Sequence, residues 1–199
     1  MFPDLIKYTV HQEPTLPPFD AMAYEYIFAS NGTFLRAENR FMEAIIPILE
    51  APQSTVRGLH MLSASIALKV PPIPASVLQD ILVDARKMRT DTDQLNEVLY
   101  RFHYDGIRVR IERPSQDTTP VSVEAMGDGG ADVILEIHSH GNMRAFWSRT
   151  DNLDLQGFRV YGVIGRLDSD VPQIRLRVGV YGYRYPITQD VIFSDTNNS

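Results

Sequence analysis

Cysteine is absent from this chain of 199 residues. Its absence excludes disulfide scaffolds, thiolate zinc fingers, iron–sulfur clusters and cysteine nucleophiles. Any metal must therefore be held by histidine and carboxylate side chains. Runs of basic residues are absent as well, and the formal net charge is −6. These two features disfavour a protein that follows the phosphates of a nucleic acid, and we expect no nucleic-acid partner.

Long apolar segments are also missing from the sequence. No apolar run approaches the roughly 18 residues that a membrane helix needs. The first residues show no basic segment followed by an apolar one, which a secretory signal would have. With 44% hydrophobic and 22% charged residues, the composition is that of a globular protein. We expect a cytoplasmic protein that does not bind membranes.

A proline cluster marks the clearest boundary along the chain. Three of the four residues at 71–74 are proline, which removes backbone donors and favours an extended connector. We therefore expect a β-rich N-terminal extension at residues 1–70 and a main domain at residues 75–199. Within the extension, Asn31-Gly32 predicts a tight hairpin between strands at 24–29 and 33–37. Partial alternation at 59–70 predicts a further strand.

One segment after the prolines has a helical pattern. Ser76 and Gln79 have the spacing of a capping box. Apolar residues then recur on one face at helical spacing, and Arg86, Lys87 and Arg89 would occupy the last turns. We therefore expect a helix over residues 76–89.

The rest of the chain reads as strands. We expect strands at 95–104 and 107–113, joined at Asp105-Gly106, and a buried strand at 133–138. Shorter or later strands are expected at 121–126, 158–167 and 174–183. One helix followed by many strands predicts an α+β fold with a mixed or antiparallel sheet.

A small group of residues carries the chemistry. His138 and His140 are two positions apart on a predicted strand, so both imidazoles point to one face and can reach the same ion. Asp151, at the end of the following loop, would be the third ligand. Three such ligands with an open fourth position describe a catalytic zinc site. Histidine pairs alone more often have no metal, so the surrounding pattern is needed.

The pattern His-x-His-x7-Ser-x2-Asp is completed by Ser148 and is expected by chance on the order of 10⁻⁴ to 10⁻³ times per chain. It resembles the JAMM motif of the JAB1/MPN/Mov34 metalloprotease family. The resemblance implies a JAB/MPN-like mixed β-sheet with flanking helices. It also implies that His138, His140 and Asp151 bind Zn²⁺, and that Ser148 either donates a hydrogen bond to the oxyanion or orients the site.

The same family carries an upstream glutamate that acts as the general base. Glu97 fits by order and spacing, because it follows the predicted helix and opens a predicted strand. The small residues that usually follow this glutamate are replaced here by Leu99-Tyr100-Arg101. Glu124 and Glu136 are therefore rival bases, and an exposed structural carboxylate is the alternative for Glu97.

The flanking sequences at 143–148, 158–167 and 175–182 resemble those of bacterial JAB proteins, in particular the PRTRC system protein A family. That resemblance implies an E1-related, ThiF-like protein as a partner. Gly141 departs from eukaryotic members, which usually carry proline after the second histidine. Trp147, the only tryptophan, could anchor the core or form a wall of the substrate channel.

The family resemblance implies a zinc isopeptidase that cleaves after the C-terminal tail of a ubiquitin-like protein. Processing of a sulfur-carrier or ubiquitin-like precursor uses the same chemistry, and a non-catalytic MPN scaffold belongs to a different class. All four motif positions are present, which favours the enzyme.

Overall fold

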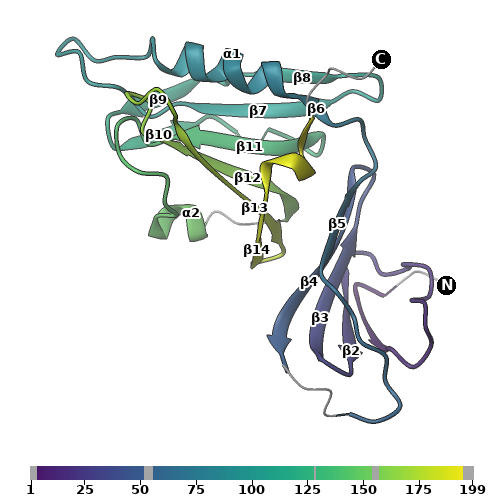
Figure 1. Ribbon diagram of the computed structural model, residues 1–199. Helices are drawn as coiled ribbons and strands as arrows, with labels where there is room; N and C mark the ends of the chain where they lie inside the picture. The colour runs from purple at the N-terminus through teal and green to yellow at the C-terminus, as the bar shows by residue number, and fades with distance from the viewer. Residues whose placement is uncertain (1–3, 52–55, 128, 154–156, 195–199) are drawn as a thin grey trace. The chain divides into compact units, whose positions relative to one another are not determined.

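The computed structural model describes residues 4–51, 56–127, 129–153 and 157–194. These residues are mostly in strands and form two compact units (Figure 1). One unit holds the residues up to Val70 together with Tyr183–Tyr185, and the other holds Pro71–Gly182 and the residues from Pro186 onward. Among the described residues, no helix is both long and apolar enough to cross a membrane.

The first unit is a five-stranded sheet with strands in chain order. Its strands are β1 (Ile6–Val10), β2 (Tyr24–Ala29), β3 (Gly32–Glu38), β4 (Met42–Glu50) and β5 (Ser65–Leu68). β1 and β2 run parallel and the other pairs are antiparallel. The expected hairpin is present, because Ala29 pairs with Gly32 across a two-residue turn. The strand expected over 59–70 is shorter and covers only β5.

A six-stranded sheet has the order β14-β13-β12-β11-β7-β8, and the second unit holds all of its residues except Tyr183–Tyr185 of β14. These strands are β7 (Leu99–Tyr104), β8 (Val109–Glu112), β11 (Val133–Ser139), β12 (Phe158–Gly165), β13 (Gln173–Val180) and β14 (Tyr183–Ile187). The β11–β12 pair is parallel, whereas β11–β7, β7–β8 and β12–β13 are antiparallel, so the sheet is mixed. A separate hairpin contains β9 (Gln116–Thr119) and β10 (Ser122–Ala125), and β6 (Ile73–Pro74) pairs with β15 (Phe193–Ser194).

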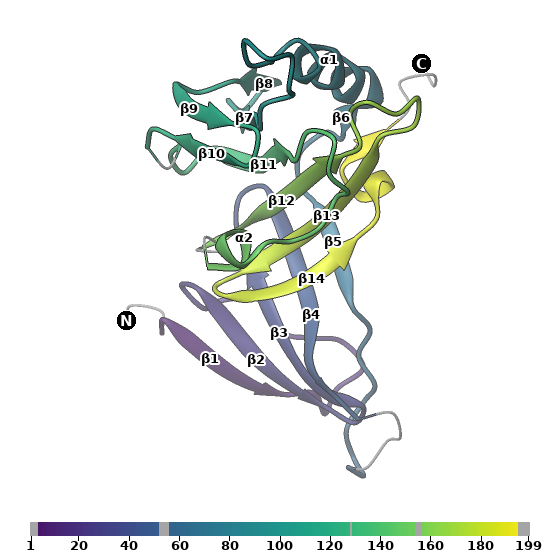
Figure 2. The ribbon, with the colours of Figure 1, turned by 90° about the vertical axis from the view of Figure 1, so that its left-hand side faces the viewer.

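Helix α1 (Ala75–Ala85) lies along the β7–β8 side of this sheet (Figures 1 and 2). It buries Leu78, Ile81, Leu82 and Ala85, which share one face at helical spacing. Asp84 also accepts a hydrogen bond from the Tyr100 hydroxyl of β7 at 2.9 Å. The other described helices are α2 (Arg149–Leu153) and the 3₁₀ turn η1 (Gln189–Val191). The domain is therefore mostly β, with fewer flanking helices than expected.

The expected ends of the first helix are wrong. The helix begins at Ala75 directly after Pro74, whose extended backbone (φ −56°, ψ 135°) forms the N-cap without a side-chain hydrogen bond. Ser76 therefore lies inside the first turn and does not form a capping box. The helix ends at Ala85, and Arg86 beyond it donates hydrogen bonds to the carbonyls of Leu167 and Ser169. The basic residues do not lie in the last turn.

The strand expected to begin at residue 95 begins at Leu99, so Glu97 does not open a strand. The backbone N–H of Glu97 instead donates to the carbonyl of Thr119, at the end of β9. The loop that carries Glu97 is therefore bound to the β9–β10 hairpin just before β7 begins. The periodicity of the sequence did not reveal this, because buried residues continue from Glu97 into β7.

Candidate metal centre

The two histidines lie together at the C-terminal end of β11, an interior strand of the sheet. His138 is the penultimate residue of β11, and His140 lies one residue beyond the end of that strand. The N–H of His140 donates to the Ile164 carbonyl of β12 at 2.7 Å, which continues the extended path past the strand end. Gly141 then turns the chain with φ +53°, a value that proline, with φ near −65°, cannot adopt. Proline therefore could not replace Gly141 in this conformation.

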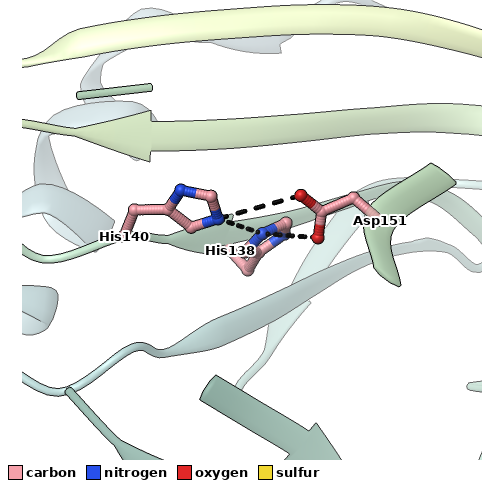
Figure 3. A group of neighbouring side chains, drawn as sticks. All are labelled: His138, His140 and Asp151. Atoms are coloured by element: carbon pink, nitrogen blue, oxygen red, sulfur yellow. Dashed lines mark hydrogen bonds and ion pairs between the residues drawn. The ribbon is translucent and has the colours of Figure 1, made fainter. Parts of the chain in front are cut away.

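Asp151 reaches the same point from helix α2. The imidazole Nε2 atoms of His138 and His140 are 3.0 Å apart (Figure 3). Asp151 Oδ1 is 3.2 Å from His138 Nε2, and Asp151 Oδ2 is 3.8 Å from His140 Nε2. The three side chains form a group that could hold a metal ion. Bonds of about 2.0–2.1 Å to a tetrahedral zinc separate two ligand atoms by about 3.3 Å, and the observed spacings bracket that value.

Ser148 and Asp151 form a reciprocal pair at the start of α2. The Oγ atom of Ser148 accepts a hydrogen bond from the N–H of Asp151 at 3.0 Å. In return, Asp151 Oδ2 accepts one from the N–H of Ser148 at 2.6 Å. This is a capping box with aspartate in the position that glutamate or glutamine usually takes. The Ser-x2-Asp spacing allows this capping box to form. The capping box in turn orients the Asp151 carboxylate, which faces the two histidines.

The protonation states of His140 and Asp151 are those that metal ligands need. Burial and the neighbouring His138 lower the pKa of His140 from 6.5 to about 4, so its imidazole is neutral at pH 7. Burial alone would raise the pKa of Asp151. However, the hydrogen bond and charge of His138 and the two bonds with Ser148 outweigh burial and lower that pKa. A neutral imidazole and an ionised carboxylate are the forms that bind metal.

Glu97 is buried beside this group, with only 5% of its surface exposed. Burial raises its pKa from 4.5 to about 7, the charge of His138 opposes the rise, and Asp151 adds to it. Glu97 lines the same cavity as His138 and Asp151. A carboxyl group that titrates near neutrality can accept and return a proton at physiological pH.

The rival carboxylates have different surroundings. Glu136, on β11, accepts a hydrogen bond from Arg101 Nε at 3.0 Å and lies 4.0 Å from a nitrogen of Arg159. Glu136 lines the cavity, but its carboxylate is paired with these two arginines. Glu124, on β10, is exposed and is not among the residues that line the cavity. Of the three candidates, Glu97 has the burial and the position that a general base needs.

A cavity of about 240 Å³ adjoins the group. Part of its lining is apolar and comes from Leu99, Val121, Val123, Met143, Phe146 and Trp147. Gly165 brings the 143–146 loop close to β12, because a Cβ atom at this position would lie 2.1 Å from the backbone nitrogen of Ala145. Trp147 is half-buried at the cavity, which favours its interpretation as a wall over that as a core anchor.

Two polar residues near the site were not singled out by sequence reasoning. Ser139, between the histidines, is fully buried and accepts a hydrogen bond from the N–H of Val98. Arg177, on β13, is buried beneath Trp147. A cation between apolar residues of a strand, Leu176 and Val178, was the signal in the sequence that could have identified Arg177.

A family model described as prokaryotic homologs of the JAB domain matches residues 75–178. No curated protein matches the chain. The matched region is more than half of the chain and contains α1, Glu97, both histidines, Ser148 and Asp151. The chain therefore belongs to the prokaryotic branch of the JAB/MPN family.

Proposed function

We propose that this protein is a zinc-dependent metallopeptidase that hydrolyses the bond after the C-terminal tail of a ubiquitin-like protein. The observation that carries the proposal is the convergence of His138, His140 and Asp151 beside the buried Glu97 in one cavity. Members of the JAB family include metallopeptidases and non-catalytic proteins, so the donor set and the base decide between them. Both are complete in this chain.

The donor set fits zinc. Zinc accepts both imidazole nitrogen and carboxylate oxygen as ligands, and three protein ligands leave a fourth position for water or substrate. When bound, zinc would supply a Lewis acid that polarises the scissile carbonyl and lowers the pKa of the attacking water. His138, His140 and Asp151 would hold the ion, and the adjoining cavity would admit the substrate.

The residues of the chain then divide the proton transfers. Glu97 takes a proton from the attacking water and later gives it to the leaving amine, a role that its buried position beside the donor set supports. The Oγ atom of Ser148 accepts the Asp151 N–H, and its hydroxyl group would donate to the developing oxyanion. A donor of that kind lowers the barrier by about 3–4 kcal/mol.

The experiment compares three glutamate variants on two substrates. Zinc-loaded wild-type protein is incubated with a linear fusion and with a lysine-linked conjugate of a ubiquitin-like protein that ends in Gly-Gly. Glu97→Gln should retain zinc and lose about 10²–10⁴-fold in rate. Glu124→Gln and Glu136→Gln are the matched controls and should stay active. A fully active Glu97→Gln variant would contradict the assigned base.

The two substrates also separate the related functions. Cleavage of the linear fusion alone favours processing of a sulfur-carrier or ubiquitin-like precursor, whereas cleavage of the conjugate favours an isopeptidase. A zinc-loaded chain that cleaves neither favours a non-catalytic MPN scaffold. The likeness to the PRTRC system protein A family supports a bacterial protein that acts with an E1-related, ThiF-like partner. Co-purification of the two proteins tests that association.

A further inference from the structure

Arg177 is a buried cation next to the candidate metal centre. It lies on β13, and only 3% of its surface is exposed. A charge in such a position is costly unless the protein supplies hydrogen-bond acceptors. Arg177 Nη2 donates to the backbone carbonyl of Asp151 at 2.6 Å, and Nη1 donates to Asn152 Oδ1 at 2.7 Å. Its guanidinium thus binds helix α2 at two consecutive residues.

The same guanidinium contacts the residue before the capping box. Its central carbon lies 3.6 Å from the centroid of the Trp147 ring, a distance typical of a cation–π contact. Trp147 and Asn152 lie on either side of Ser148 and Asp151 in the sequence. A planar group with donors in fixed directions can hold both ends of this short segment at once, which a lysine could not.

Helix α2 reaches the sheet through the Asp151 carboxylate, which lies beside His138 and His140, and through Arg177. It contains five residues, Arg149–Leu153, and none of them is buried. A helix of that length is not stable by itself, because one or two turns do not repay the cost of nucleation. The capping box orients the Asp151 carboxylate relative to its own helix, but it does not fix that helix to the sheet. Arg177 provides a connection from β13, in addition to the contacts of the Asp151 carboxylate with His138 and His140.

We propose that Arg177 is a positioning residue that fixes α2 to the sheet and thereby sets the affinity of the His138, His140 and Asp151 group for zinc. This inference rests on the proposed zinc site. Arg177 acts through the backbone carbonyl of the ligand-bearing residue and does not itself bind the ion. Residues that orient metal ligands in this way usually change metal affinity about 10–100-fold when they are replaced.

The test is a zinc titration of the metal-free full-length chain against a competing chromophoric chelator. Arg177→Met removes the donors and should weaken zinc binding about 10–100-fold. Arg177→Lys keeps the charge without the fork and should give an intermediate loss. The matched control is Arg175→Met, two residues earlier on the same strand and exposed, which should bind zinc as wild type does.

A second variant covers the case in which Arg177→Met does not fold. Asn152→Ala removes one acceptor on the partly exposed side of the contact and should also weaken zinc binding. Trp147 is the only tryptophan, so its emission reports the stacking directly. It should shift in both Arg177 variants and stay unchanged in Arg175→Met. Thermal unfolding of the metal-free variants separates a loss of affinity from a loss of fold.

The outcomes separate this inference from the proposed function. If folded Arg177→Met or Asn152→Ala binds zinc as tightly as the Arg175→Met control, the positioning role is overturned. If affinity falls only in variants whose metal-free form is already unfolded, the role is structural and the inference is also overturned. Wild-type protein that binds no zinc contradicts both proposals. Since no peptide substrate is used, a chain without hydrolytic activity still tests Arg177.

Discussion

Ser139 and Val98 exchange two hydrogen bonds at the buried end of β11. The N–H of Ser139 donates to the Val98 carbonyl at 2.9 Å, and the N–H of Val98 donates to Ser139 Oγ at 3.0 Å. Ser139 separates the two histidines, and Val98 follows Glu97 in the chain. The residue between the two candidate ligands therefore fastens the segment that carries the candidate base.

Replacing Ser139 by alanine should destabilise the protein and disturb Glu97. The change leaves the buried N–H of Val98 without its acceptor, which costs about 1–3 kcal/mol. For a chain of this size we expect the midpoint of thermal unfolding to fall by several degrees. Ser139→Thr keeps the hydroxyl and should be milder. Ser76→Ala, at an exposed serine that does not cap α1, is the control. Equal midpoints for Ser139→Ala and Ser76→Ala would contradict the role of this hydrogen bond.

Ser148→Ala should affect both zinc binding and catalysis. The variant loses the Oγ atom that caps α2 at the Asp151 N–H, which costs about 0.5–2 kcal/mol of local stability. It also loses the oxyanion donor, so we expect the rate of hydrolysis to fall about 10²–10³-fold. Ser148→Thr retains the hydroxyl and should recover most of the zinc affinity. A Ser148→Ala variant with wild-type zinc affinity and wild-type rate would refute both roles.

Glu97 should make the metal-free protein less stable as the pH rises. Its pKa of about 7 in the folded state exceeds the ordinary value of 4.5, so between these values the folded chain holds a proton that the unfolded chain has released. The stabilising contribution of the neutral carboxyl is complete below about pH 4.5 and is lost as the pH rises through about 7.

His140 has the opposite effect on the pH dependence of stability. The difference in the free energy of unfolding between wild type and Glu97→Gln therefore isolates the contribution of Glu97. The folded protein favours the neutral form of the His140 ring, because it lowers the pKa of this residue from 6.5 to about 4. The stabilising contribution of His140 is therefore present above pH 6.5 and is lost as the pH falls through about 4. Chemical denaturation of both proteins in a chelator, across this pH range, measures the difference. If the free energies of unfolding of wild type and Glu97→Gln changed with pH in parallel, Glu97 would have no raised pKa.

Much of the fold could be predicted from local patterns. Aspartate-glycine at 105–106 predicts the β7–β8 hairpin, and β7 pairs with β8 on either side of that turn. The run at 133–138 predicts a buried strand, and β11 extends one residue further. Such features depend on neighbouring residues, whose chemistry the sequence displays directly. The β9 strand had no clear alternation, and its pairing with β10 was not predicted.

Features that depend on distant parts of the chain were harder to predict. Asp151 was expected at the end of a loop, whereas it lies in α2, which Arg177 contacts from a strand 26 residues away. The start of α1 was misplaced because Pro74 itself supplies the extended N-cap residue, so a serine cap is not needed. The Ser148–Asp151 capping box was a local signal for α2, whereas the contact of α2 with Arg177 is tertiary and has no local signal. The convergence of the candidate ligands was expected from their strand spacing and from the family resemblance, and their binding of metal remains a prediction.

Metal content is the most direct measure of the central claim, which is that His138, His140 and Asp151 converge on one divalent cation. Wild-type protein, His138→Ala, Asp151→Ala and the exposed control His60→Ala are purified with zinc, dialysed and analysed for metal. Wild type and His60→Ala should each retain about one zinc ion per chain, and the two ligand variants should retain almost none. Equal zinc contents in wild type and His138→Ala would contradict the account.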